Sequence, residues 1–201
     1  PNLWFAGIIG TCLWLPNSVF VGLWGVPYYS TVYHMTTVQT TEILSCVFLG
    51  WAVGGPLQGL IADRFGNIYL QMFFGSIIAA IFLAISIFVP MNLMDLRVCL
   101  FLTGFFSSVQ IMIFTVARVN IQERFLGMGI AFINGLTMLG GMFMPSLVGY
   151  LLVLGWDHTY AHGVPVYSVQ NYQHALIALP FVVSFAGVCA LILKFRNKSS
   201  S

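Results

Sequence analysis

The sequence predicts an all-α membrane protein built from six transmembrane helices. Its composition is the first reason, because charged residues make up 6% of the 201 positions and hydrophobic residues 59%. Water-soluble domains of this size seldom reach such values. The second reason is that six apolar stretches follow one another, each close to the roughly 20 residues that cross a hydrocarbon core of about 30 Å. The mean hydropathy of +0.95 agrees with a chain that lies mostly in the membrane.

Polar or charged breaks separate the six stretches. The predicted spans are residues 3–32, 41–62, 68–90, 97–118, 127–155 and 174–194. An even number of spans puts both termini on one side of the membrane. If that side is the cytoplasm, only Arg97 of the seven basic residues lies outside, which satisfies the positive-inside rule. We therefore expect a multi-pass protein with both termini cytoplasmic, in a bacterial inner membrane.

Charge and cysteine usage narrow the functional classes. The net charge is +2 and the basic residues are scattered, so we expect no nucleic-acid partner. The longest outer loop, about residues 156–173, holds Asp157, His158 and His162, which we interpret as polar surface rather than metal ligands. We predict no metal and no cofactor. The cysteines lie in apolar spans without paired spacing and are interpreted as packing residues: Cys12, Cys46, Cys99 and Cys189.

Polar side chains are distributed unequally among the spans. The first and fourth spans carry amides and hydroxyls at mid-depth, where an unsatisfied polar group costs several kcal/mol. These two spans should face protein or a watery cavity. The third and sixth spans contain little beyond Ser76, Ser86 and Ser184, so they can face lipid all round. Pro16 and Pro27 are expected to interrupt the first span.

Glycines mark the second and fifth spans. They are Gly50, Gly54, Gly55 and Gly59 in one, and Gly135, Gly140, Gly141 and Gly149 in the other. Small residues at such spacing permit close contact between helices. Cavity-facing, close-packing and lipid-facing roles thus recur in the same order along the chain. This order predicts two three-helix repeats, about residues 1–92 and 93–201, which are typical of secondary transporters.

The most specific motif stands at the end of the second span, where the chain reads Gly59-Leu-Ile-Ala-Asp63-Arg64-Phe-Gly66-Asn67. It resembles the Gly-x-Leu-Ala-Asp-Arg-x-Gly-Arg-Arg loop of the major facilitator superfamily. Gly59 would permit close helix approach, Asp63 would accept from amides at a helix N-terminus, Arg64 would pair with an acid, and Gly66 would turn the chain.

The resemblance also suggests which part of such a transporter this chain represents. Asn67 and Ile68 stand where the family usually has two basic residues, and the motif is typically fuller in the first half of these proteins. The chain starts at Pro1, inside an apolar stretch. We therefore expect residues 1–201 to be the C-terminal six-helix domain, with the N-terminal half absent from this chain.

A second group of charges is expected on the same inner side. Arg118, Glu123 and Arg124 follow the fourth span and, in the resemblance, belong with the Asp63-Arg64 turn. A cytoplasmic charge cluster of this kind would bias the equilibrium between inward-open and outward-open states. The alternative is that these residues are ordinary interfacial charges at helix ends.

Candidate substrate residues come from the polar faces of three spans. On a helical wheel, one face of the first span gathers around Asn17, one face of the fourth around Gln110, and the fifth adds a third amide. The resemblance agrees, because the first helix of each repeat lines the central cavity in this superfamily. The candidates are Trp14, Asn17, Trp24, Tyr28, Ser107, Gln110, Phe114 and Asn134. Equally, the amides could bond between helices and the aromatic rings could simply pack.

The resemblance implies a secondary transporter that moves a small organic metabolite by alternating access, and not an enzyme. The complete transporter would be a monomer in the bilayer. Symport with protons would need a titrating carboxylate in the missing half, or Glu42, because the acids here lie at helix ends or in loops. The alternatives are a channel subunit and an intramembrane protease, for which Ser107 and Ser108 lack a histidine at their depth.

Overall fold

Six helices in the structure are long and apolar enough to cross a membrane, as predicted. The computed structural model describes residues 2–161 and 164–198. The spans are Asn2–Tyr33, Thr37–Phe65, Ile68–Phe88, Leu93–Asn120, Glu123–Leu154 and Val169–Asn197. Most extend past the predicted ends, because helical hydrogen bonding continues into the polar residues that flank each apolar stretch.

The first span changes its helical geometry near its middle. It consists of α1 (Asn2–Leu15), the π-helical segment η1 (Pro16–Trp24) and α2 (Gly25–Tyr33). Proline has no N–H to donate to the carbonyl four residues before it, so the ladder loses one hydrogen bond at Pro16. A wider turn follows, in which the Gly25 N–H donates to the Phe20 carbonyl five residues earlier. The predicted interruption is therefore a widened helix and not a gap.

The second span is one unbroken helix, α3 (Thr37–Phe65), that contains Pro56. Its start is fixed by a capping box, in which the Thr36 hydroxyl accepts from the Gln39 backbone N–H and the Gln39 side chain accepts from the Thr36 N–H. These bonds satisfy donors that the first turn of a helix leaves without partners.

A tight turn joins α3 to the third span, α4 (Ile68–Phe88). Gly66 has a φ of 67°, a left-handed conformation that residues with a Cβ rarely adopt, and its N–H donates to the Ala62 carbonyl. The Asn67 side chain then accepts from the Leu70 N–H and caps α4. The structure confirms the turn predicted at Gly66. It also gives Asn67, which replaces a basic residue of the motif, a capping role.

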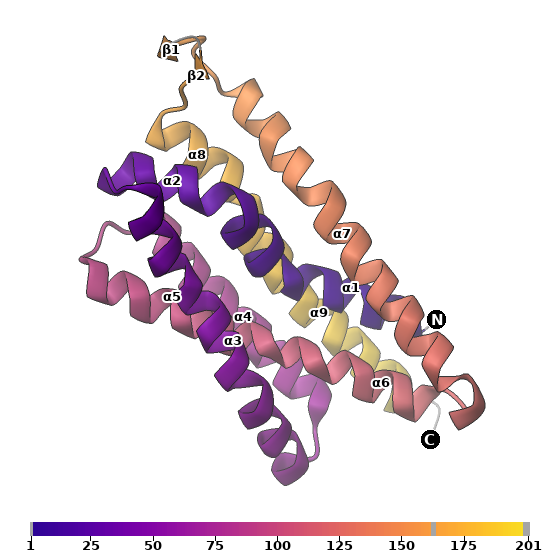
Figure 1. The fold of residues 1–201 in the computed structure, drawn as a ribbon. Helices are drawn as coiled ribbons and strands as arrows, with labels where there is room; N and C mark the ends of the chain where they lie inside the picture. The colour runs from indigo at the N-terminus through magenta and orange to yellow at the C-terminus, as the bar shows by residue number, and fades with distance from the viewer. Residues whose placement is uncertain (1, 162–163, 199–201) are drawn as a thin grey trace.

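The fourth span also changes its helical geometry, but here the helix becomes tighter, whereas the first span becomes wider. It runs through α5 (Leu93–Ser107), the short 3-10 segment η2 (Ser108–Ile111) and α6 (Met112–Asn120). The remaining elements are η3 (Glu123–Phe125), α7 (Leu126–Leu154), the two-residue strands β1 (Tyr160–Ala161) and β2 (Val164–Pro165), α8 (Val169–Leu176) and α9 (Ala178–Lys198). The antiparallel pair β1–β2 forms a small hairpin above the last two spans (Figure 1).

Three pairs of helices make the main contacts of the bundle: α3 with α5, α4 with α9, and α1 with α7. The first of these pairs depends on glycine. A Cβ added to Gly50 would lie 2.0 Å from the Phe101 carbonyl oxygen, and one added to Gly104 would lie 1.9 Å from that of Val47. The predicted close contact of the second span is confirmed, and its partner is the fourth span.

The pair α4–α9 corrects one prediction. The third and sixth spans were expected to face lipid on all sides, but they pack against each other, and Met72, Ala79 and Leu83 of α4 are fully buried. Only part of the surface of α4 and of α9 therefore carries exposed side chains. The fifth span is the most open, because only 17% of its most apolar stretch is buried, compared with 61% in the first span.

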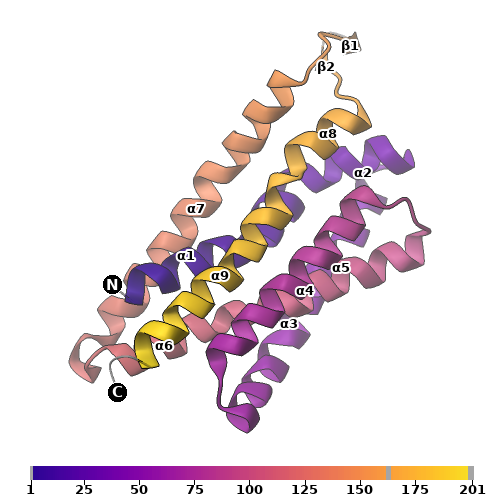
Figure 2. The ribbon, with the colours of Figure 1, turned by 180° about the vertical axis from the view of Figure 1, so that it is seen from behind.

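The turns of the bundle gather at its two ends. The α3–α4 turn, the α6–α7 turn, the start of α1 and the end of α9 lie at one end, and the hairpin and the α2–α3 and α4–α5 turns lie at the other (Figures 1 and 2). We call these the motif end and the hairpin end. At the motif end, both views show the α3–α4 turn standing apart from the α6–α7 turn.

Candidate functional site

A cavity of about 270 Å³ lies among the first, second, fourth and fifth spans. We call it the four-span pocket. Four of the predicted substrate residues line it: Trp14, Gln110, Phe114 and Asn134. The other lining residues are Trp51, Ile111, Ile113, Thr137 and Met138. The structure thus brings half of the predicted set to one place, from α1, η2, α6 and α7.

Gln110 provides the main polar group of the four-span pocket. Its side chain is 6% exposed, and its Nε2 donates to the Gly10 carbonyl oxygen at 3.0 Å. Its Oε1 is buried and has no hydrogen-bond partner among the described residues. A buried polar atom without a partner costs free energy, and more so in the membrane. The Oε1 atom is therefore an acceptor that a bound molecule can satisfy.

Trp51 of α3 supplies the complementary donor. Its indole Nε1 is buried and, within the described part of the chain, makes no hydrogen bond. The Trp51 ring meets the Trp14 ring edge to face, with 6.3 Å between the ring centroids. Two aromatic residues and the residues that carry one donor and one acceptor thus line the same space. Such an apolar cavity with few polar groups is typical of small-molecule sites.

The fifth span contributes a different kind of surface. The Thr137 hydroxyl is only 2% exposed and already donates to the Ile133 carbonyl at 3.0 Å, so it offers no free proton to a ligand. Asn134 is exposed on α7 and is one of the residues that line the pocket. The described lining contains no Asp, Glu, Lys or Arg residue. The four-span pocket is therefore uncharged.

Four predicted substrate residues lie outside the lining of this pocket. Asn17 is 2% exposed, and neither its Oδ1 nor its Nδ2 has a hydrogen-bond partner among the described residues. Trp24 donates from Nε1 to the Pro145 carbonyl at 3.1 Å. Tyr28 is 1% exposed and donates to the Ile87 carbonyl, and Ser107 donates to its own helix. Their assignment to the substrate stays a prediction.

The π-helical segment contributes to this separation for Asn17, Trp24 and Tyr28, which follow Pro16 in the first span, whereas Ser107 lies at the end of α5. The helical wheel assumed 100° per residue through the whole first span, but η1 has more residues per turn. Residues that follow Pro16 are therefore rotated away from the face that carries Trp14. Sequence reasoning also missed Trp51, because its span was interpreted only from its glycines. An indole in the middle of a glycine-rich span was the available signal.

The motif residues at the α3–α4 turn are exposed. Asp63 and Arg64 make no ion pair with any described residue, and the only ion pair between two described residues joins Arg97, near the start of α5, to Glu42, near the start of α3, at 3.0 Å. Apart from the adjoining backbone of its own helix, no described atom lies within 4 Å of a Cβ added to Gly59. The contacts predicted for these three positions are thus not made within the described part of this chain.

The second group of predicted charges lies at the same end, after α6. Arg118 borders a small cavity with Phe114 and Leu126. Glu123 and Arg124 lie in η3, and the Arg124 guanidinium lies 5.2 Å from the centroid of the Phe125 ring. The two charged turns share the motif end, as predicted, but no ion pair between described residues connects them (Figure 1).

The outer loop makes local contacts of its own. The Thr159 hydroxyl donates to Asp157 Oδ1 at 2.9 Å, and this bond lowers the pKa of the exposed Asp157 carboxyl. Within the described residues, no three His, Cys, Asp or Glu side chains gather in a way that could hold a metal. His162, considered with Asp157 and His158 at the outset, lies outside the described residues.

Comparison with known proteins identifies the family. A sequence model of the Major Facilitator Superfamily matches residues 6–199, almost the whole chain. The MFS-type transporter oryN of Aspergillus oryzae is 29% identical over 163 residues, which cover 78% of this chain and 30% of that protein. The match therefore covers less than a third of the length of that relative. With six spans and the motif turn in place, the chain belongs to the major facilitator superfamily of membrane transporters.

Proposed function

We propose that this chain is the C-terminal half of a secondary transporter that moves a small, uncharged organic molecule by alternating access. The four-span pocket is this half's share of the substrate site. The observation that carries the proposal is that two residues lining the same uncharged cavity, Trp51 and Gln110, each hold a buried polar atom, Nε1 and Oε1, with no hydrogen-bond partner among the described residues. A substrate that accepts from one atom and donates to the other would relieve both.

Alternating access follows from how this family works. Two six-helix domains rock about a site between them, so one half supplies one wall. The glycine-bearing, poorly buried faces of α3 and α7 are available for the second half. We use "complete transporter" for this chain joined to its N-terminal half, and we expect it to act as a monomer. The expectation of a bacterial inner membrane stays a prediction, since the matched relative is fungal.

The site is tested by substitutions that remove the polar atoms and keep an apolar side chain. In the complete transporter, Trp51→Phe removes the indole donor, and Gln110→Met removes the amide, both its free Oε1 and the Nε2 that bonds to Gly10. Each should raise the KM for uptake about tenfold, the effect of about 1.4 kcal/mol. Trp4→Phe, in an exposed tryptophan that packs on Phe132, is the matched control. An unchanged KM in both site variants would place the substrate elsewhere.

The same uptake assay separates a carrier from a channel. A carrier shows saturation and exchange of external for internal substrate, whereas an open pore shows neither. The exposed Asp63 is then tested by Asp63→Asn, which should reduce the transport rate while substrate affinity stays within about twofold, because its role is in the conformational change. Equal transport by the variant and the parent would remove Asp63 from the mechanism.

Ion coupling, in this proposal, depends on groups outside the four-span pocket. Its described lining has no carboxylate, so a proton-coupling acid would belong to the other half or be Glu42. Glu42 is exposed at the hairpin end and is bonded to Arg97. If it couples protons, Glu42→Gln will abolish uptake driven by a pH gradient and preserve exchange. If gradient-driven uptake persists, the acid lies in the other half.

A further inference from the structure

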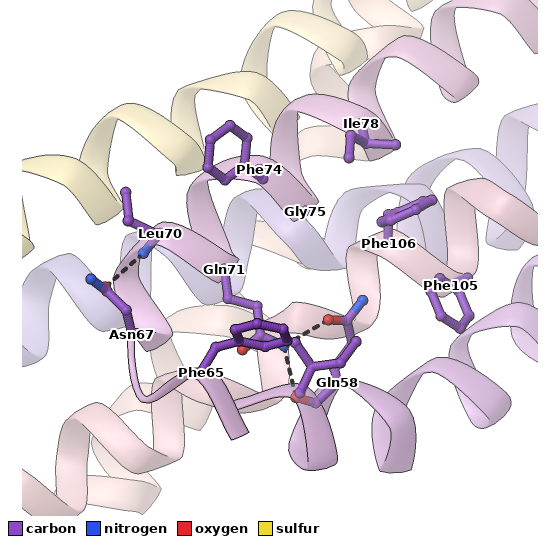
Figure 3. A pocket seen from close by; sticks show the side chains of 11 residues that line it. Gln58, Phe65, Asn67, Leu70, Gln71, Phe74, Gly75, Ile78, Phe105 and Phe106 are labelled. Atoms are coloured by element: carbon purple, nitrogen blue, oxygen red, sulfur yellow. Dashed lines mark hydrogen bonds between the residues drawn. The ribbon is translucent and has the colours of Figure 1, made fainter. Parts of the chain in front are cut away.

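A groove of about 590 Å³ lies away from the four-span pocket, between the end of α3, the first half of α4 and the end of α5. We call it the α3–α4 groove. Its walls are mostly aromatic or aliphatic side chains, including Phe65, Phe74, Ile78 and Phe106. Phe65 and Phe74 are 74% and 57% exposed, so the groove opens on the outside of the bundle (Figure 3). The occupant of such a surface must satisfy a large apolar area.

Two amides are set into this apolar wall. Gln71 Nε2 donates to the side-chain Oε1 and to the backbone oxygen of Gln58, both at 2.7 Å. Gln58 is only 3% exposed, yet its Nε2 donates to no described residue and turns away from Gln71 toward the side of Phe106 (Figure 3). An amide donor facing hydrocarbon is costly. The groove is thus suited to a molecule that has an apolar body and an oxygen acceptor.

The depth of the amide pair identifies that oxygen. With 29 residues, α3 is about 43 Å long, close to the full 40–45 Å thickness of a bilayer with its headgroup regions. Gln58 precedes Phe65, the end of α3, by two turns or about 10 Å. The amide pair therefore lies close to the level where the hydrocarbon core meets the polar part of the lipid, which is where ester carbonyl groups stand. From there the groove continues toward Ile78 and the middle of the membrane.

We propose that the α3–α4 groove binds one glycerophospholipid of the adjoining leaflet. An acyl chain lies against Phe74, Ile78 and Phe106, and an ester carbonyl oxygen accepts from Gln58 Nε2. Arg64, exposed in the same turn as the lining residues Phe65 and Asn67 and without an ion-pair partner among the described residues, provides a positive charge for the phosphate. This site shares no lining residue with the four-span pocket, so it is independent of the proposed substrate.

The carbonyl contact is tested by a competition between two lipids. The complete transporter is purified and incubated with equal amounts of ester-linked and ether-linked phosphatidylcholine with identical chains. Native mass spectrometry then counts the lipid that stays bound. The parent protein should retain the ester form about fivefold over the ether form, which lacks the carbonyl oxygens. Gln58→Met should abolish the preference, and Gln110→Met, in the other pocket, should preserve it. Equal retention of both lipids by the parent would overturn the carbonyl contact.

The groove itself is tested by blocking and by labelling. Ile78→Trp fills the cavity and should lower lipid occupancy at least fivefold, whereas Val188→Trp, on an exposed position of α9 outside the groove, should not. Phosphatidylcholine with a photoreactive acyl chain should label peptides containing Phe74 or Phe106 of the unmodified protein more than those containing Val188. Even labelling of both regions, or retention of detergent or fatty acid in place of phospholipid, would refute the site.

Discussion

Two of the three main helix pairs of the bundle, α3–α5 and α1–α7, differ in the atoms that make their closest contacts. At the α3–α5 crossing, backbone meets backbone, because added Cβ atoms on Gly50 and Gly104 would strike carbonyl oxygens. At the α1–α7 crossing, backbone meets side chains. A Cβ on Gly7 would lie 2.3 Å from the Leu136 Cδ1, and one on Gly140 would lie 1.9 Å from the Thr11 Cγ2. A carbonyl group cannot move without its helix, whereas a side chain can turn.

Because of this difference, two helix pairs that the predicted repeat relates to each other should differ in rigidity. In the proposed repeat, exchanging the first three spans with the last three converts the pair α3–α5 into the pair α7–α1. The α3–α5 pair is then the rigid one, and we call its contact surface the seam. The other, which carries Trp14 and Asn134 of the four-span pocket, can adapt. A transporter needs both properties, because the site must adjust while the domain moves as one body.

The largest loss of stability is expected from a substitution at Gly104, where α3 and α5 approach closely. Gly104→Ala places a methyl group 1.9 Å from the Val47 carbonyl oxygen, so α3 and α5 must separate. We expect a loss of about 3 kcal/mol of unfolding free energy, at the upper end for overpacked sites. Thermal unfolding of the purified complete transporter measures it. A midpoint equal to that of the parent would show that the seam is not rigid.

The adaptable pair should tolerate the same change better. A methyl group at Gly140 requires Thr11 to rotate, which breaks the hydrogen bond from its hydroxyl to the Leu136 carbonyl, 2.9 Å long. The expected loss is about 1 kcal/mol, the net value of one hydrogen bond. Comparing Gly140→Ala with Gly104→Ala in the same unfolding assay tests the contrast directly. A Gly140→Ala protein as unstable as Gly104→Ala would remove it.

A smaller loss of stability is expected when the ion pair between α3 and α5 at the hairpin end is removed. Arg97 Nη2 lies 3.0 Å from Glu42 Oε1, and the two side chains are 41% and 67% exposed. Exposed pairs contribute about 0.5 kcal/mol or less and are screened by salt. Glu42→Gln should lower the unfolding midpoint slightly at low ionic strength and not at all in about 1 M salt. A loss that persists in high salt would contradict this assignment.

The smallest effect on stability is expected at Gly59. Apart from the adjoining backbone of its own helix, no described atom lies within 4 Å of an added Cβ. Alanine also has the higher helix propensity, so Gly59→Ala should leave the unfolding of this chain unchanged or slightly delayed. Gly59→Leu should be equally stable in this chain alone. In the complete transporter, the same leucine should slow uptake if the other half lies against this face. Normal uptake by the Gly59→Leu transporter would show that Gly59 does not lie at the interface between the two halves.

Much of the fold could be predicted from the sequence, because the bilayer reduces the problem to apolar length. The six spans and the turn at Gly66 depend on composition and on one backbone conformation, and both are visible in the residues themselves. The partners of apolar helices were not predictable in the same way. Hydropathy shows that α4 and α9 avoid water, but it does not distinguish lipid from another helix, so their mutual contact was missed.

The candidate site was also predicted only in part, because it too depends on how the helices are arranged. Gln110 and Phe114 were predicted on one helix face because helices keep a nearly constant angle per residue, Trp14 and Asn134 were candidates from two other spans, and the structure brings all four to one pocket. Beyond Pro16 that angle changes, and the predicted face no longer continues. Trp51 was missed because the value of an indole depends on whether its N–H finds a partner, and only the arrangement of helices decides that.

The widened segment η1 also affects how this chain is compared with its relatives. A turn closed by bonds to the fifth residue holds one residue more than an α-helical turn of the same height. A relative with an ordinary helix there would lack one residue between Pro16 and Trp24 while keeping Trp14 and Tyr28 in equivalent places. Alignments of the first span should therefore allow a one-residue gap inside the helix. Without it, every position on one side of the segment is matched to the wrong neighbour.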